Sequence, residues 1–357
     1  MKKLKNMNKN TKSNLLTYMM VIVTYVIVQI FIATGNMSSL MEGLLVPVCT
    51  YVILAVSLNL TVGILGELSL GHAGFMCVGA FASALFSLGM KDSIENDLLR
   101  FIVAILIAAV SAAVAGILVG IPVLRLKGDY LAIVTLAFGE IIKNFINAIY
   151  LGVDANGLHF SMKDTMSLGM EADGKILIKG AQGITGTPHC SNFTIGVILI
   201  MLSLVIINNL VNSRTGRAVM SIRDNRIAAE SVGINITKYK LIAFTISASL
   251  AGVAGALYAH NLSTLMATPK NFGYNMSIMI LVFVVLGGIG NMRGSVIAAV
   301  LLTLLPELLR GLADYRMLIY AIVLIFMMLF NWSPQFIDFR KKMMSKFKNK
   351  KKAEKEA

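Results

Sequence analysis

The sequence predicts an all-α integral membrane protein with about ten transmembrane helices. Apolar residues make up 57% of the 357 positions and charged residues only 14%, whereas about a quarter of a soluble domain is charged. Apolar runs of about 20 residues recur along the chain, which is the length that a helix needs to cross a bilayer. The net charge of +14 collects at the two ends and in selected loops, so it indicates membrane topology and not a nucleic-acid partner.

Ten predominantly apolar windows are the expected spans. They cover residues 15–33, 44–65, 68–90, 101–124, 130–150, 193–211, 241–262, 275–290, 294–310 and 317–332. An even number of spans places both termini on one side of the membrane. With cytoplasmic termini, the inner segments hold 23 of the 32 Lys and Arg residues and the outer segments hold eight, while Lys143 lies within a span. This asymmetry favours ten helices with both ends inside.

The spans define the expected organisation of the chain. Residues 1–14 form a basic cytoplasmic N-terminus, residues 15–332 the transmembrane domain, and residues 333–357 a basic tail that lies against anionic lipid. Within the domain, residues 151–192 form an outer loop and residues 212–240 a cytoplasmic loop. The first apolar run is long and lacks a small-residue cleavage site, so it is expected to be a retained helix. The three scattered cysteines predict neither a disulfide framework nor a zinc site.

Two neighbouring pairs of spans are joined by almost nothing except glycine-rich junctions. One junction holds glycines between Gly63 and Gly79, and the other holds glycines between Gly287 and Gly294. Both could be broken helices or re-entrant turns, which line cavities in transporters because freed backbone groups need partners. Close helix packing through small residues is the equal alternative. The similarity of the two junctions also hints at an internal repeat.

The first junction concentrates polar groups in apolar surroundings. Ser69, Gly71, His72 and Gly74 are the candidate residues of a translocation path there. An ionisable side chain inside a bilayer normally faces a cavity or a partner. His72 could relay protons, although a histidine that is hydrogen-bonded to a neighbouring helix is the more common case.

A second polar group lies on the span at 130–150. Glu140, Lys143, Asn144 and Asn147 follow i, i+3, i+4 and i+7 spacing and therefore share one helix face. Such a stripe must turn toward protein or water, and a zwitterionic substrate would suit it. An ion pair that only holds two helices together is the alternative.

The basic segment 212–240 is expected to be a docking surface on the cytoplasmic side. Residues 218–232 contain no proline or glycine and predict one short helix, which Gly233 would end. An amphipathic helix on the membrane surface is the alternative. No phosphate-binding loop, metal-ligand set or activated nucleophile is apparent, so the chain is not expected to be an enzyme or to hydrolyse ATP itself.

Several segments, quoted as they stand, resemble the LivM-type permeases of branched-chain amino acid ATP-binding cassette (ABC) transporters. They are LSLGHAGF at 68–75, GDYLAIVTLAFGEII at 128–142, GGIGNMRGS at 287–295, the glycine-rich stretch 180–188 and the basic loop. The resemblance extends from about Leu44 to Trp332. It implies an importer permease for leucine, isoleucine and valine in a prokaryotic inner or plasma membrane. The implied fold is a helical bundle with two inverted halves and discontinuous helices.

The resemblance also implies partners and a role for the basic loop. The partners are a LivH-like second permease, two ABC ATPase subunits that bind ATP and Mg²⁺, and an extracytoplasmic substrate-binding protein. The loop would be the ATPase-coupling segment, carried by Arg217, Arg223, Asp224, Ala228, Ala229, Glu230 and Gly233. The general importer motif is Glu-Ala-Ala, three residues, then Gly. Ala228, Ala229 and Gly233 match it, but Ile227 stands where the glutamate would be.

Other readings of the sequence stay open. The outer loop, with a strand-like stretch at Lys175–Lys179, could receive the binding protein or be a solvated decoration. Permeases of the same broad group carry urea, amides, sugars or nucleosides. A different class is a proton-coupled secondary transporter that uses Glu140, Lys143 or His72. A membrane-bound enzyme is the most distant alternative, because no catalytic constellation supports it.

Overall fold

The computed structural model describes residues 9–91, 93–126, 128–154, 157–170, 174–310 and 315–332. The basic tail expected at 333–357 and most of the charged N-terminal residues lie outside these ranges. The helical elements, in chain order, are α2 (Lys9–Ala33), α3 (Ser39–Asn59), the π-helical turn η1 (Leu60–Leu65), α4 (His72–Gly89), α5 (Asp97–Val123), α6 (Asp129–Ala148), the 3-10 turns η2 (Met166–Leu168) and η3 (Gly180–Gln182), α7 (Phe193–Asn212), α8 (Arg214–Asp224), α9 (Arg226–Ser231), α10 (Ile236–Ala259), α11 (Pro269–Phe272), α12 (Tyr274–Gly287), α13 (Met292–Leu308) and α14 (Arg316–Trp332).

A helix forms at each of the ten predicted spans, which confirms the helical membrane class. In the described part of the chain, eight helical stretches are long and apolar enough to cross a membrane; α3 with η1 and α11 with α12 count as one stretch each. Helices α13 and α14 have 17 residues each. Each is therefore about 26 Å long, slightly less than a typical hydrocarbon core.

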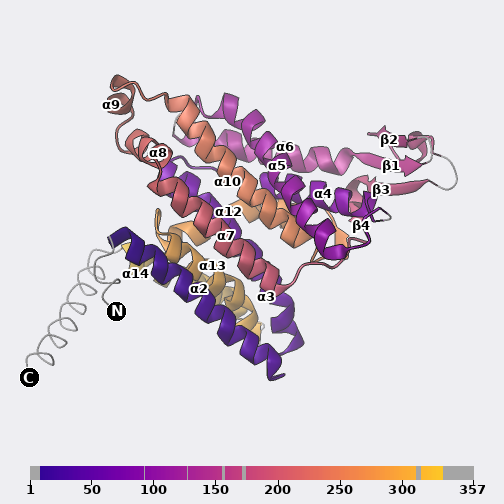
Figure 1. The fold of residues 1–357 in the computed structure, drawn as a ribbon, viewed down its shortest axis with the longest axis horizontal. Coiled ribbons are helices and arrows are strands. Elements are labelled where there is room, and N and C mark those ends of the chain that lie inside the picture. The colour runs from indigo at the N-terminus through magenta and orange to yellow at the C-terminus, as the bar shows by residue number, and fades with distance from the viewer. Residues whose placement is uncertain are drawn as a thin grey trace, which may run out of the picture.

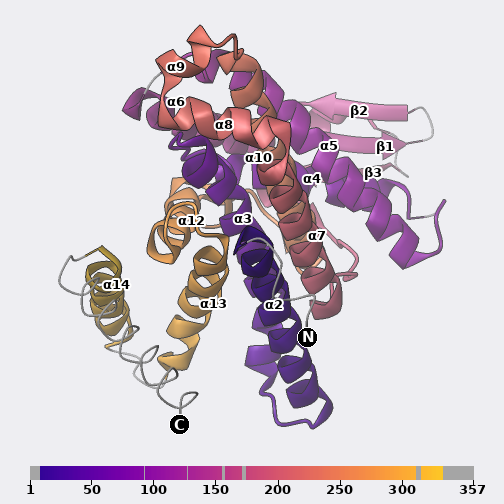
Figure 2. The ribbon, with the colours of Figure 1, turned by 60° about the vertical axis from the view of Figure 1, so that its left-hand side comes forward.

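The connecting segments sort to two ends of the bundle. Helices α8 and α9 lie at one end and the small β-sheets at the other, as both views show (Figures 1 and 2). Gly66, Gly128 and Ile222 line a common pocket of about 280 Å³ beside α8. Three of the segments that the predicted topology places in the cytoplasm, those at Gly66, Gly128 and Ile222, therefore lie together at one end of the described bundle.

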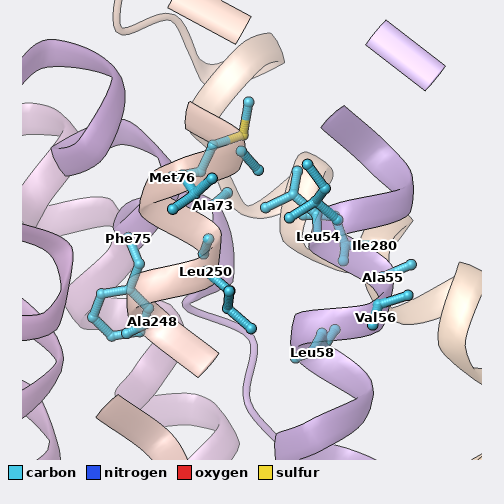
Figure 3. Packing of buried hydrophobic residues seen from close by; sticks show 14 of the residues in the cluster. Leu54, Ala55, Val56, Leu58, Ala73, Phe75, Met76, Ala248, Leu250 and Ile280 are labelled. Carbon is cyan, nitrogen blue, oxygen red and sulfur yellow. The ribbon is translucent and has the colours of Figure 1, made fainter. Parts of the chain in front are cut away.

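The core forms where α10 packs against α3, α4 and α5. Figure 3 shows part of it, with Leu54 of α3, Met76 of α4 and Leu250 of α10 among the buried side chains. Small residues allow the close approach: a Cβ atom on Gly252 would lie 2.4 Å from the carbonyl oxygen of Ala108. Because lipid gives no hydrophobic drive for helix association, such close packing contributes much of the bundle's stability.

The outer loop contains β-structure that an all-α expectation omits. Strands β1 (Tyr150–Asp154), β2 (Gly157–Ser161) and β3 (Lys175–Lys179) form an antiparallel sheet in the order β2-β1-β3. The strand predicted at Lys175–Lys179 is confirmed. Strands β4 (Ile184–Thr185) and β5 (Thr264–Leu265) pair with each other and tie the outer loop to the segment after α10.

The two glycine-rich junctions differ from each other. The first leaves a non-helical segment, 66–71, between η1 and α4, so it interrupts the helices as one alternative predicted. The second is only a tight turn between α12 and α13, in which Gly288 and Gly290 have φ values of +94° and +80°. A further interruption, at Gly273 between α11 and α12, was not predicted.

Candidate functional site

A buried polar cluster surrounds the N-terminus of α4. The backbone N–H of Leu70 donates to Thr135 Oγ1 of α6 at 3.0 Å, and that of Ala73 donates to Ser277 Oγ of α12 at 3.1 Å. His72 Nε2 lies 2.7 Å from Ser57 Oγ of α3. Side chains from three helices thus satisfy the polar groups exposed where α4 begins.

Close packing holds α4 against α6 at this level. A Cβ atom on Gly71 would lie 2.3 Å from the carbonyl oxygen of Thr135, and one on Gly74 would lie 2.7 Å from the Cα of Gly139. The sequence left open whether the junction glycines mark a broken helix or close helix packing. Both hold for Gly71 and Gly74, because they border a helix interruption and also allow close packing. Thr135 and Gly139 flank the middle of α6, so α4 begins at mid-depth of that span.

Ser69 and His72 face a closed interior. Ser69 is 1% exposed, and its hydroxyl has no hydrogen-bond partner among the described residues. His72, Thr135 and Ser277 are also buried. A solute would reach these groups only after neighbouring helices separate.

Glu140 and Lys143 form an ion pair next to this cluster. The pair lies within α6, and the Lys143 side chain is more deeply buried than that of Glu140. Glu140 Oε1 also accepts a hydrogen bond of 2.7 Å from the backbone N–H of Tyr274, the first residue of α12. The carboxylate therefore lies at the N-terminus of a helix, where negative charge is stabilised.

The predicted polar stripe on α6 is only partly correct. Asn147 donates to the carbonyl of Ala267 at 2.8 Å, so it points inward with Glu140 and Lys143. Asn144 is exposed. It follows Lys143 directly and therefore lies about 100° further around the helix, on the edge of the stripe that faces away from the bundle.

Two helix N-termini consequently meet at mid-depth. Tyr274 and Ser277 belong to the first turn of α12, and Ser277 binds the backbone of Ala73 in the first turn of α4. Helix N-termini favour anionic groups, whereas Glu140 favours a cationic one. Sequence reasoning did not name Thr135 or Ser277 as site residues, although Thr135 lies inside a quoted motif.

The basic segment is tied to the bundle by two contacts. Arg223 of α8 donates from Nη1 to the carbonyl of Gly63 in η1 at 2.9 Å and also pairs with Asp224. Lys240, in the first part of α10, forms a largely buried ion pair with Glu67. Both anchors lie on the stretch 63–67 that leads into α4, so this stretch connects the basic segment with the polar cluster.

The prediction of a single helix over 218–232 is wrong, because the helix is interrupted at Asn225. This residue has an extended backbone, and its side-chain oxygen accepts from the N–H of Ala228 at 3.1 Å, which starts α9 as a separate helix. Asparagine competes with helical hydrogen bonding in this way and favours caps. Gly233 ends α9 with φ +83°, as predicted.

Helix α9 and its C-cap residue, Val232, present apolar side chains to the surroundings. Ile227 is 81% exposed and Val232 is 75% exposed, whereas Ala229 is buried beside Ile222 and Ile236. The other predicted coupling residues, Arg217, Ala228 and Glu230, are exposed, and Arg217 donates to the carbonyl of Asn212. Ile227 and Val232 were not among the predicted contact residues, because exposure of a short helix cannot be read from its sequence.

A helical membrane bundle with a buried polar cluster at mid-depth and an exposed basic segment at one end is typical of a membrane permease. The family described as the permease component of the branched-chain amino acid transport system matches residues 40–330. The chain belongs to this family.

Individual relatives agree with this assignment. The chain is 37% identical to the high-affinity branched-chain amino acid transport system permease protein LivM of Salmonella typhimurium over 294 residues, which covers 80% of this chain and 67% of that protein. LivM of Escherichia coli gives the same identity over 295 residues, with the same coverage. The nucleoside ABC transporter permease NupC of Lactococcus lactis is 26% identical over 213 residues, or 56% of this chain and 60% of NupC. No solved structure matches the chain.

Proposed function

We propose that this chain is a permease subunit of an ABC importer for branched-chain amino acids. The observation that carries the proposal is the form of the basic segment: α9 exposes Ile227 and Val232 at one end of the bundle, while Arg223 and Lys240 tie the same segment to the helices. An exposed apolar patch outside the bilayer is typical of a protein contact. A segment that binds a partner and also contacts the bundle can transmit a movement of the partner to the transmembrane helices.

The partner on this side is an ATPase. The chain supplies the path, and two separate ABC ATPase subunits with ATP and Mg²⁺ supply the energy; this places α8, α9 and both termini in the cytoplasm of a prokaryotic cell. The charge distribution supports this orientation. A LivH-like permease completes the membrane part, and a substrate-binding protein approaches the β-sheets of the outer loop.

The polar cluster at mid-depth is the proposed translocation site. A branched-chain amino acid is zwitterionic: its carboxylate suits the N-termini of α4 and α12, and its ammonium group suits Glu140. The apolar side chain needs no hydrogen bond. Ser69, His72, Thr135 and Ser277 are buried in the described conformation, so passage requires α12 to move away from α4 and α6.

The likeness to LivM of two species supports leucine, isoleucine and valine as substrates. NupC is similar over a shorter part of the chain, and it is named for nucleosides. The motifs therefore support the transport class more strongly than the cargo.

Uptake of labelled leucine in cells that carry the whole gene cluster tests the proposal. The uptake is compared after ATP depletion and after collapse of the proton gradient with ATP maintained. Loss on ATP depletion alone is the expected result. Loss on gradient collapse alone would contradict it and favour a proton-coupled secondary transporter that uses Glu140 or His72, while ATP-dependent uptake of other solutes without leucine would overturn the substrate assignment.

A further inference from the structure

The π-helical turn η1 lies between the basic segment and the turn that joins α12 to α13. A π-helical turn is rare and is frequently found at functional sites. In this protein it follows α3 directly, and all six of its residues are buried. Its two sides contact segments that are far away in the sequence.

One side of η1 is held by α8. The Gly63 carbonyl accepts the hydrogen bond from Arg223 across a separation of 160 residues. Gly66, the residue directly after η1, packs against the same arginine: a Cβ atom on it would lie 2.5 Å from Arg223 Cγ. Arg223 therefore contacts the C-terminal part of η1 and the residue after it through a hydrogen bond and through direct packing.

The other side of η1 is held by the α12–α13 turn. A Cβ atom on Gly63 would lie 2.4 Å from the backbone nitrogen of Gly290. Asn59, the last residue of α3, accepts a hydrogen bond of 2.8 Å from the N–H of Gly290 and donates one of 2.9 Å to Ser295 Oγ of α13. Asn59 and Ser295 are both fully buried, so water does not compete for these bonds.

Helix α12 connects this turn to the translocation site. It runs without interruption for 14 residues from Tyr274, which binds Glu140, to Gly287 at the turn. Such a helix is about 21 Å long, and its uninterrupted hydrogen bonding favours movement as one unit. A displacement of the turn is therefore delivered to the end of α12 that closes on α4 and α6.

We propose that Asn59 is a positioning residue that transmits movement of α8 to α12, through η1 and the α12–α13 turn. When η1 moves toward the α12–α13 turn, the close approach of Gly63 to Gly290 displaces the turn. When η1 moves away, the two hydrogen bonds of Asn59 draw the turn with it. This role rests on the proposed function, since it needs an ATPase that moves α8. It adds a route by which the movement reaches the polar cluster.

The test replaces Asn59 by leucine, which has a similar size but forms neither hydrogen bond. The complete transporter is purified with its ATPase subunits and reconstituted, and leucine uptake and ATP hydrolysis are measured together. We expect Asn59→Leu to retain its ATPase subunits and its ATP hydrolysis while the leucine transported per ATP falls about tenfold. A role confined to stability would lower both rates in proportion to the amount of folded transporter, and would leave this ratio unchanged.

Two controls match the substitution. Thr50→Val removes a buried hydrogen bond of α3 that stays within the helix, to the carbonyl of Val46. Gly43→Ala adds a methyl group to α3 where a Cβ atom meets no other atom within 4 Å. Both controls are expected to keep the wild-type ratio. Gly63→Ala is expected to lower it, because the added methyl group would collide with both Asn59 Oδ1 and the backbone of Gly290.

A double substitution tests whether Arg223 and Asn59 act on one route. Arg223→Gln alone is expected to lower the ratio, and adding Asn59→Leu is expected to lower it little further, because the route is already broken. A ratio in Asn59→Leu equal to that of Thr50→Val, or fully multiplicative losses in the double variant, would overturn the proposal. Failure of the proposed function is distinguishable, since it would abolish ATP-dependent uptake in the unmodified transporter itself.

Discussion

The polar cluster at mid-depth and the segment formed by α8 and α9 are built in opposite ways. In the cluster, Gly71 and Gly74 bring α4 against the backbone of α6. The polar side chains there are buried, and Thr135 and Ser277 accept hydrogen bonds from the backbone where α4 begins. In the other region, α9 rests on a small core of Ile222, Ala229 and Ile236 and leaves Ile227 and Val232 exposed.

The difference indicates where each region does its work. A closed, tightly packed cluster keeps the membrane sealed until its helices move, and any change there is felt by several helices. In the α8–α9 segment, the exposed side chains can be replaced with little effect on contacts inside this chain. No other part of the described chain covers the apolar side chains of Ile227 and Val232. We therefore expect substitutions in the cluster to affect folding and transport together, and substitutions in α9 to affect coupling alone.

Removing the charge of Glu140 is expected to have the largest effect. Glu140→Gln leaves Lys143 buried without its counter-charge, which costs about 3–5 kcal/mol, and it also weakens the contact with Tyr274. The thermal stability of the purified protein and leucine uptake should both fall. The double variant Glu140→Gln with Lys143→Met separates the alternatives: recovery of stability without uptake supports a transport role, while recovery of both would show a purely architectural pair.

Adding a methyl group at the α4–α6 crossing should have the next largest effect. A Cβ atom on Gly74 would lie 2.7 Å from the Cα of Gly139, so Gly74→Ala forces the two helices apart at a cost of about 1–3 kcal/mol. Gly89→Ala, at the other end of α4, is the matched control because a Cβ atom there has open space. Equal melting temperatures for the two variants would argue against the tight crossing.

In the α8–α9 segment, Gly233 provides a smaller and more selective test. Its φ of +83° costs an alanine about 1–2 kcal/mol, whereas asparagine tolerates the left-handed region better. Gly233→Ala should lower ATP-dependent uptake while membrane insertion, measured by protease accessibility, is unchanged. Gly233→Asn should retain more uptake than Gly233→Ala; the reverse order would mean that the turn after α9 does not limit coupling.

The smallest effect is expected from the two asparagines of α6. Asn147→Ala removes the hydrogen bond to Ala267 and should cost about 0.5–1.5 kcal/mol, seen as a lower melting temperature. Asn144→Ala, on the exposed edge of the same helix, should be neutral in both stability and uptake. A loss of uptake in Asn144→Ala would contradict this expectation and support the sequence prediction that all four polar residues of α6 contribute to the translocation path.

Span positions were predictable because they depend on the length of apolar runs, which the bilayer sets. The helix end at Gly233 was predictable as well, since a left-handed residue after a helix favours glycine. The depth at which α4 begins, the interruption at Gly273 and the inward faces of Thr135 and Ser277 depend on which helices become neighbours. Asn225 was overlooked because the absence of proline and glycine does not exclude a side-chain cap inside a helix-prone run.

Site-specific photo-crosslinking from α9 tests the central claim most directly. A photoreactive phenylalanine analogue is placed at 227 or 232 in the complete transporter in native membranes. Position 166 on the outer loop, which is at least as exposed, is the control. The account predicts that positions 227 and 232 form a crosslinked product with an ATPase subunit and that position 166 does not. Crosslinking of 227 and 232 to lipid alone, with an ATPase captured from neither, would contradict it.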